Sequence, residues 1–261
     1  MKVWFIGAGP GDPELMTRKA WRVLSQADVV LHDSLMDTAG MHEAAPNAQW
    51  LDVGKRSGRP SVEQEFICRS LVTLAKRGLT VVRLKGGDPA MFGRLAEELQ
   101  ACRAENIEVE IIPGVTAACA AAADLQTSLT LRGESRSVVF VTPRLGKHEA
   151  NTRNEWLTAA MAAQTVVLYM ASAQAKEICS ALIEAGKSKQ TPICIVENAS
   201  RSGARFKQTL FELAQDGLPK LEGPVTLLVG QALALAQVQQ APAANISPER
   251  VPASPSKHAV A

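Results

Sequence analysis

Short apolar runs alternate with longer amphipathic segments along the first half of the chain. Runs rich in β-branched residues predict strands, and segments with apolar residues three or four positions apart predict helices. The predicted strands are Val3–Ile6, Val29–Leu31, Trp50–Val53, Thr80–Leu84 and Val109–Ile112. The predicted helices are Glu14–Gln26, Val62–Lys76, Leu95–Glu105 and Thr116–Asp124. This alternation is typical of βαβ units, so we expect a parallel sheet.

The helical period is lost between Asp124 and Gly133, where turn-forming and β-branched residues are concentrated. Beyond this break the pattern predicts strands at Val138–Thr142, Thr165–Met170, Pro192–Val196 and Val225–Val229, and helices near Trp156–Ala163 and Ala175–Ala185. We therefore predict two α/β domains, residues 1–125 and 126–240. Residues 241–261 hold four of the 14 prolines and no aromatic residue. We expect them to form a disordered tail, because burial could not offset their ordering entropy.

The composition narrows the class of protein. With 261 residues, 46% of them hydrophobic, the chain is long enough to bury a large core. The 28 basic and 26 acidic residues give a net charge of +2, which provides no general attraction to nucleic acid or to an anionic membrane. No apolar stretch reaches the roughly 20 residues of a membrane helix, and the N-terminal run is too short for a signal peptide. The five cysteines contain no C-x-x-C pair, and the four histidines have no metal-ligand spacing. We expect a cytoplasmic protein with reduced thiols and no metal.

A glycine-rich turn, Gly7-Ala8-Gly9-Pro10-Gly11-Asp12, lies between the first predicted strand and the first predicted helix. Glycines here let the backbone approach a ligand closely, and the N-terminus of the following helix favours negative charge. A dinucleotide fingerprint would need glycine where Asp12 stands. A purely structural tight turn is the other alternative, although three glycines in five residues exceed what a turn alone requires.

A second turn, Lys85-Gly86-Gly87-Asp88-Pro89, follows another predicted strand. Ligands of open parallel sheets bind beyond the carboxyl ends of the strands, so we expect the two turns to converge on one crevice. The structural alternative makes Gly86-Gly87 a loop and Asp88 with Pro89 a helix start. That reading is compatible with ligand contact, but it does not explain why two such turns occur.

The two turns carry a resemblance to a known family. G-A-G-P-G-D-P-E-L-M-T-R-K-A and V-V-R-L-K-G-G-D-P-A-M-F-G-R resemble the two signatures of the uroporphyrinogen-III C-methyltransferases, in the tetrapyrrole methylase superfamily. V-G-K-R-x-G lies between them and I-P-G-V-T-A follows them. The similarity extends from about Val3 to Leu235.

The resemblance implies two α/β domains with the active site in the cleft between them, usually in a homodimer. Members of the family transfer methyl groups from S-adenosylmethionine to two ring carbons of uroporphyrinogen III. The products are precorrin-2, for sirohaem or cobalamin synthesis, and S-adenosylhomocysteine. Among possible partners, the resemblance therefore implies this small-molecule substrate, and neither nucleic acid nor a membrane.

The resemblance also assigns roles by motif. Asp33 and Lys55 match the proton acceptor and the proton donor. The implied cofactor contacts are Pro10, Gly86, Gly87, Asp88, Met91, Thr116, Ala117, Met170 and Ala199. The expected cations for a substrate with eight carboxylates are Arg56, Arg59, Arg94 and Arg132.

The residue chemistry agrees with these roles. A sulfonium donor already carries an activated methyl group, so the protein mainly has to align donor and acceptor, while a carboxylate such as Asp33 can remove the proton. Without the resemblance, Asp33 could equally cap a loop, and the Lys55, Arg56 and Arg59 loop could be a solvated face.

The chain departs from the family pattern mainly on the expected substrate side. His32 replaces a tyrosine, Leu131 a histidine, Pro143 the glycine of T-G-H, and Ala199 a glycine. These departures leave two alternatives open: a divergent paralogue acting on a later corrinoid precursor or another acceptor, and a catalytically weak S-adenosylmethionine-binding protein.

The near-neutral net charge is a sum of opposed segments. Residues 51–95 contain nine basic and four acidic residues, whereas residues 96–124 contain one basic and six acidic residues. The basic segment includes V-G-K-R and the second glycine turn. Positive charge is therefore expected near the proposed cleft.

Overall fold

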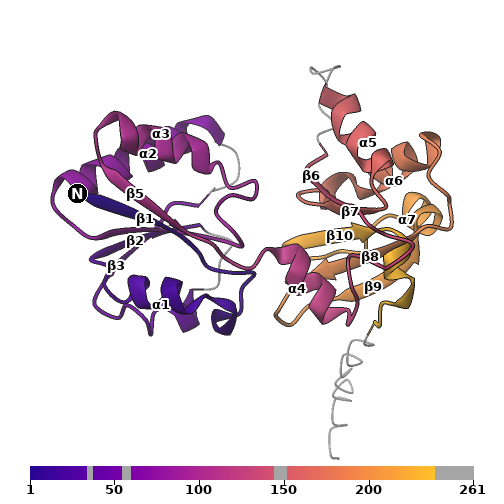
Figure 1. The fold of residues 1–261 in the computed structure, drawn as a ribbon, viewed down its shortest axis with the longest axis horizontal. Helices are drawn as coiled ribbons and strands as arrows, with labels where there is room; N and C mark the ends of the chain where they lie inside the picture. The colour runs from indigo at the N-terminus through magenta and orange to yellow at the C-terminus, as the bar shows by residue number, and fades with distance from the viewer. Residues whose placement is uncertain (34–37, 55–59, 144–151, 239–261) are drawn as a thin grey trace, which may run out of the picture.

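The computed structural model describes residues 1–33, 38–54, 60–143 and 152–238. Within them the chain forms two five-stranded sheets joined by the segment that follows the last strand of the first sheet (Figure 1). The first sheet contains β1 (Lys2–Gly7), β2 (Val29–His32), β3 (Gln49–Asp52), β4 (Val81–Lys85) and β5 (Glu108–Ile112). Its order is β3-β2-β4-β1-β5 and every pair is parallel, which confirms the predicted parallel sheet.

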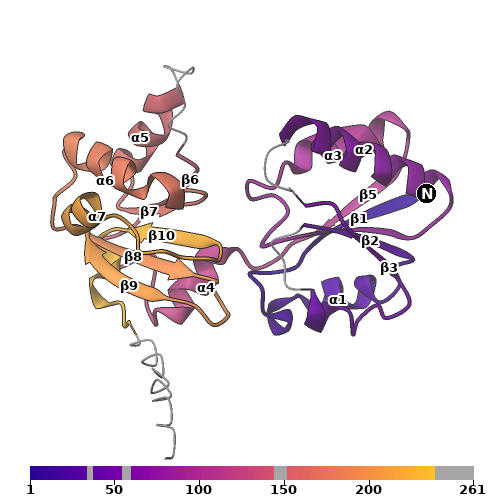
Figure 2. The ribbon, with the colours of Figure 1, turned by 180° about the vertical axis from the view of Figure 1, so that it is seen from behind.

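Helices cover both faces of the first sheet. The helix α1 (Arg18–Leu24) lies on one face, and α2 (Pro60–Lys76) and α3 (Leu95–Ala104) lie on the other (Figures 1 and 2). Side chains alternate along each strand, so Val3 and Phe5 of β1 pack with α2 and α3, whereas Trp4 and Ile6 pack on the α1 side. The predicted helix 14–26 is wrong in its first turn. Residues Pro13–Leu15 form a separate 3₁₀ turn, and Thr17 caps α1 through its hydroxyl.

The second sheet is mixed. It contains β6 (Val138–Val141), β7 (Thr165–Leu168), β8 (Pro192–Glu197), β9 (Arg205–Thr209) and β10 (Val225–Val229), in the order β6-β7-β10-β8-β9. Only the β6–β7 pair is parallel. The helices α5 (Thr152–Ala162), α6 (Ala175–Glu184) and α7 (Leu210–Asp216) cover one face, and α4 (Ala117–Asp124) and the 3₁₀ segment Gln231–Leu235 cover the other.

Two of these elements, β9 and α7, were not predicted. Strand β9 reads R-F-K-Q-T, with one large apolar residue, and lies at the edge of the sheet. Helix α7 follows at once and is held by a capping box between Thr209 and Glu212.

The linking helix α4 packs on the second sheet, because Ala118, Ala121 and Leu125 share a core with Val167, Cys194 and Leu228. The division into domains at residue 125 stays a prediction, and this packing favours a boundary before Ala117. In the part of the chain that the structure describes, no helix has the length and apolarity needed to cross a membrane.

Candidate active site

The two glycine turns meet at the carboxyl ends of β1 and β4. The Gly9 N–H donates to the Gly87 carbonyl at 3.2 Å, and the Gly87 N–H donates to the Gly9 carbonyl at 2.7 Å. Both residues have positive φ, 73° and 68°, which glycine adopts without strain. The convergence expected from the strand ends is therefore found as direct backbone pairing.

A third segment, the turn after β5, packs into the same junction. A Cβ atom placed on Gly7 would lie 2.5 Å from the nitrogen of Gly114, so neither segment has room for a side chain there. Asp88 ties this turn to the second glycine turn: its carboxylate accepts from the Gly114 N–H at 3.0 Å and from the Ala90 N–H at 2.8 Å. Asp88 does not start a helix, because α3 begins at Leu95; it instead joins two turns, so that three loops meet at one place.

The N-terminus of α4 brings in the residues from the second sheet. Thr116 occupies the cap position, and its hydroxyl lies 2.6 Å from the hydroxyl of Tyr169, just after β7. Met170 follows with φ of 54° and an exposed side chain. Tyr169 thus links Met170 to the segment that contains Thr116 and Ala117, although the sequence predicted these contacts from two separate motifs.

Ala199 lies on the loop that touches the first glycine turn. The neighbouring Ser200 accepts a hydrogen bond from the Asp12 N–H at 3.2 Å, and its own N–H donates to Asp124 at 2.9 Å. Arg201 also approaches this turn, because a Cβ on Gly11 would meet its side chain at 2.5 Å. The loop carrying Ala199 and the turn carrying Pro10 are therefore in contact.

Asp33, the predicted proton acceptor, directly follows β2. One of its carboxylate oxygens accepts a hydrogen bond from Arg83 of β4 at 2.5 Å. The Arg83 side chain is 2% exposed and that of Asp33 is 36% exposed. The arginine therefore fixes the carboxylate from inside the protein and leaves part of it accessible.

Behind this pair lies a buried cluster centred on Glu98 of α3, whose side chain is fully buried. Glu98 accepts from Lys85 at 2.9 and 3.0 Å, from the Arg83 Nε at 3.3 Å and from Gln64 at 3.2 Å. Arg83 and Lys85 reach it from the same face of β4, because side chains two positions apart share a face. Asp33, Arg83, Glu98 and Lys85 thus form a connected group of two acids and two bases.

Burial and neighbouring charges act on the bases of this cluster in opposite ways. Burial lowers the pKa of Lys85, the nearby Arg83 charge lowers it further, and Glu98 only partly opposes them. Burial also disfavours the Arg83 cation, but the carboxylates of Asp33 and Glu98 outweigh it and raise the Arg83 pKa. Arg83 is therefore the permanently charged centre of the group.

The predicted cations are only partly described. Lys55, Arg56 and Arg59 lie outside the described residues. Arg94 makes a two-pronged ion pair with Glu97, at 2.8 and 2.6 Å, and its hydrogen bonds to the Glu97 carboxylate raise the Arg94 pKa. Arg132 is exposed on the turn between Leu131 and Ser135. Neither of these two arginines contacts Asp33 among the interactions of the described residues.

Comparison with known proteins agrees with this arrangement. Residues 2–214 match the family model of the tetrapyrrole (corrin/porphyrin) methylases. The chain belongs to this family. It is 41% identical to a uroporphyrinogen-III C-methyltransferase of Pseudomonas aeruginosa, over 88% of this chain and 93% of the relative.

Solved structures of tetrapyrrole methylases share the fold. The uroporphyrin-III C-methyltransferase of Thermus thermophilus, complexed with S-adenosylhomocysteine, superposes with a TM-score of 0.76 and is 32% identical; the match covers 90% of this chain and all of that one. A cobalt precorrin-4 methyltransferase superposes with a TM-score of 0.77 and is 30% identical, covering 89% and 95% of the two chains. Both the two-sheet architecture and the family assignment are therefore established.

The buried cluster of this methylase was missed by sequence reasoning, although two signals for it were present. Arg83 and Lys85 interrupt an otherwise apolar strand at alternate positions, and Glu98 falls on the apolar face of a helix with Leu95, Leu99 and Cys102. A charged residue at a core position calls for a buried partner. Neither signal identifies the residue that pairs with the buried charge.

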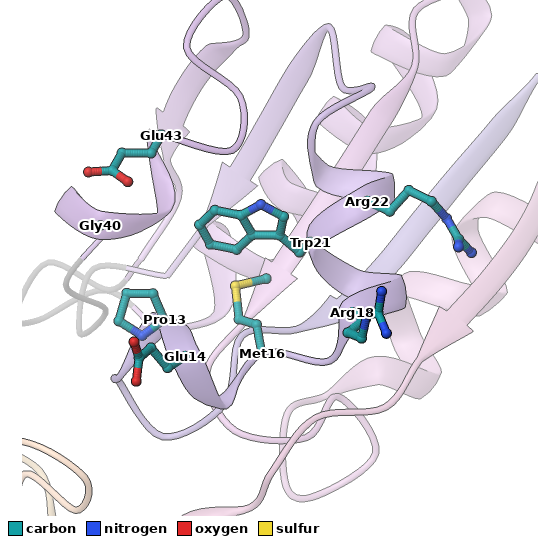
Figure 3. Close-up of a pocket in the computed structure, with 8 residues that line it drawn as sticks. All are labelled: Pro13, Glu14, Met16, Arg18, Trp21, Arg22, Gly40 and Glu43. Carbon is teal, nitrogen blue, oxygen red and sulfur yellow. The ribbon is translucent and has the colours of Figure 1, made fainter.

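A surface pocket of about 510 Å³ lies beside the first glycine turn (Figure 3). Trp21 and Met16 form its centre, with Arg18 and Arg22 on one side and Glu14 and Glu43 on the other. It does not include the paired glycines or Asp33, and its mixed charge does not favour a polyanion. We assign it no role in the methylase site.

Proposed function

We propose that this chain is an S-adenosylmethionine-dependent C-methyltransferase that converts uroporphyrinogen III to precorrin-2 by two ring-carbon methylations, in sirohaem or cobalamin biosynthesis. The proposal includes a cytoplasmic location and a homodimer. The main support for the proposal is that the two glycine turns pair directly through their backbones and that Gly114 packs against both of them. The relative at 41% identity bears the name of this enzyme.

The junction fits the proposed donor. Gly86 and Gly87 leave backbone without side chains accessible beside the buried Gly9, at the carboxyl end of a parallel sheet, where ligands of such sheets bind. Pro10, Asp88, Met91, Thr116, Ala117, Met170 and Ala199 lie on the connected loops around it. When bound, S-adenosylmethionine supplies an activated methyl group, and these residues hold it in one orientation.

Asp33 is the proposed base. Each methylation of a ring carbon requires the loss of a proton, and a partly exposed carboxylate at a strand end can accept it. Arg83 restrains the Asp33 carboxylate, and Glu98, which Lys85 also holds, restrains Arg83 in turn. Lys55 is proposed as the proton donor, and Arg56, Arg59, Arg94 and Arg132 as partners of the substrate carboxylates.

A second candidate function is methylation of a later corrinoid precursor. The likeness to a cobalt precorrin-4 methyltransferase favours it, since that structure superposes as well as the Thermus enzyme does. His32, Leu131 and Pro143 depart from the uroporphyrinogen family on the expected substrate side, and Ala199 replaces a glycine at a proposed donor contact. The other proposed donor contacts keep the family pattern.

Mass analysis separates these functions. We expect purified protein, incubated with S-adenosylmethionine and reduced uroporphyrinogen III, to add two methyl groups to the substrate. Calorimetry should show binding of S-adenosylhomocysteine and not of NAD. If the protein binds S-adenosylhomocysteine but the substrate gains no mass, uroporphyrinogen III is not its substrate, and the protein is the paralogue or a weak binder. If it binds only NAD, the proposal that S-adenosylmethionine is its methyl donor is wrong.

A further inference from the structure

The chain contains a single tyrosine, Tyr169, at the point where β7 leaves the second sheet. Its hydroxyl accepts a hydrogen bond from the Ala118 N–H at 3.0 Å and lies 2.6 Å from the Thr116 hydroxyl. Met170 is the next residue. Tyr169 itself matched no assigned role, yet it touches two of the three second-sheet segments proposed to hold the donor.

The hydroxyl of Tyr169 takes over the capping of α4. The first N–H groups of a helix lack partners within the helix, and the residue at the cap position usually satisfies one of them. Thr116 holds that position but makes no side-chain cap bond, and its hydroxyl instead contacts that of Tyr169. The N-terminus of this helix therefore depends on a side chain from a distant strand.

The ring of Tyr169 also reaches the first sheet. Phe92, on the turn after the second glycine motif, lies with its ring centroid 5.7 Å away at 60°, a favourable tilted contact. Phe92 and Met170 both have positive φ, 55° and 54°, which is strained for side chains of this size. Such conformations persist only where surrounding contacts hold them, and Tyr169 contacts the Phe92 ring and directly precedes Met170.

We propose that Tyr169 is a positioning residue for the methyl donor. It holds three segments in one fixed relation: the Phe92 turn beside Met91, the α4 N-terminus with Thr116 and Ala117, and Met170. The inference rests on the proposed function, because these segments are the proposed donor site. It goes further in assigning a role that no motif assigned.

Electrostatics allow the hydroxyl to keep both contacts. Burial raises the Tyr169 pKa, and the hydrogen bonds with Thr116 and Ala118 oppose this shift without cancelling it. The group therefore stays protonated at neutral pH. A neutral hydroxyl can accept a hydrogen bond from the Ala118 N–H and at the same time form a hydrogen bond with the Thr116 hydroxyl.

The Tyr169→Phe variant tests this role. It keeps the ring contact with Phe92 and removes the hydroxyl, so S-adenosylhomocysteine should bind about tenfold more weakly by calorimetry, the effect of one typical hydrogen bond. The matched control is Thr165→Val on the same strand, which removes a buried hydroxyl paired with Ser135 at 2.7 Å. Both variants should lower the unfolding temperature, but only Tyr169→Phe should lower donor affinity.

A spectroscopic readout covers the case in which Tyr169→Phe does not fold. Because the chain has one tyrosine, full-length protein labelled with 3-fluorotyrosine gives a single fluorine resonance. We expect saturating S-adenosylhomocysteine to shift this resonance. An unmoved resonance, or equal affinity in wild type and Tyr169→Phe, would overturn the inference.

The outcomes also separate this inference from the proposed function. If donor binding depends on Tyr169 but uroporphyrinogen III gains no methyl group, the substrate proposal fails and the role of Tyr169 stands. If the wild-type protein methylates uroporphyrinogen III and Tyr169→Phe binds the donor normally, the function stands and the inference fails. If wild type binds no S-adenosylhomocysteine, both fail.

Discussion

The interiors of the two sheets contain different polar groups. Around the first sheet the structure buries Arg83, Lys85 and Glu98, each at most 3% exposed. Around the second sheet, the buried polar side chains among the described residues are the hydroxyls of Ser135, Thr165, Thr191 and Thr226. Burying charge is costly unless it is paired, whereas a buried hydroxyl needs one hydrogen bond.

This difference divides the proposed work between the sheets. The first sheet maintains a buried ion network that ends at a partly exposed carboxylate, which is what fixing a reactive side chain requires. Loops with positive φ at residues other than glycine lie beside both sheets, for example at Phe92 and Arg94 after β4 and at Met170 and Ser200 beside the second sheet. The difference therefore lies in the side chains: buried charges hold the proposed reactive carboxylate beside the first sheet, whereas loops of both sheets shape the backbone around the proposed donor site.

The largest expected effect comes from Glu98→Gln. It leaves Arg83 and Lys85 as neighbouring buried cations with one fewer negative charge, so the free energy of unfolding should fall by about 3–5 kcal/mol in urea titrations. The matched control is Glu105→Gln at the end of the same helix, where an exposed pair with Lys76 contributes less than about 1 kcal/mol.

The second sheet provides the contrast for that experiment. Thr165→Val removes the buried hydroxyl pair with Ser135 and should cost about 1 kcal/mol. If Thr165→Val and Glu98→Gln destabilised the protein equally, the distinction between a charged and an uncharged interior would have no energetic meaning.

The next effect is on catalysis rather than stability. Asp33→Ala should lower kcat by about 100-fold, as expected for the loss of a general base, while affinity for S-adenosylhomocysteine stays unchanged. Stability should also fall, though by less than in Glu98→Gln, because buried Arg83 loses its shortest ion pair but keeps its bond to Glu98, and Asp33 is partly exposed. Steady-state methylation and calorimetry measure the two quantities. Equal loss of turnover and donor affinity would make Asp33 a structural residue of the loop.

The parallel sheet and the meeting of the glycine turns could be predicted because both follow from local pattern. Alternating strands and helices fix the strand direction, and parallel strands end at the same edge. Glycines after β1 and β4 therefore have to lie at the same edge of the sheet. Their direct pairing also requires β1 and β4 to be neighbours, which only the structure shows.

The mixed sheet and the buried cluster could not be predicted in the same way. Strand β9 carries Arg205 and Lys207 around one phenylalanine, so its strand character comes from pairing with β8 rather than from its own pattern. Glu98 could be recognised as a charged residue on an apolar face, but its partners lie on β4 and α2. Such tertiary partners cannot be read from helical period.

The smallest expected effect is on stability and concerns a carboxylate of the second sheet that accepts hydrogen bonds from two neighbouring loops. Glu197, at the end of β8, accepts hydrogen bonds from the Gly223 and Glu222 N–H groups at 2.8 Å and from the Ala204 N–H at 3.2 Å. The bond from Gly223 contributes most to lowering the Glu197 pKa below 4.5, followed by those from Ala204 and Glu222, and burial only partly opposes them. Glu197 therefore binds backbone N–H groups, whereas Asp33 binds the side chain of an arginine.

A carboxylate whose pKa is lower in the folded state stabilises the protein above the unfolded value and loses that contribution as the pH falls through the folded value. Glu197→Gln should therefore reduce stability at pH 7 by about 0.5–1 kcal/mol, because the group is only partly buried, and flatten the decline below about pH 4.5. Glu222→Gln, at an exposed side chain three residues before β10 whose own N–H donates to Glu197, serves as the control. Urea titrations between pH 3 and pH 7 measure both variants. If Glu197→Gln instead lowered kcat without changing the acid limb, the second sheet would carry side-chain chemistry as well, and the division between the two sheets would be wrong.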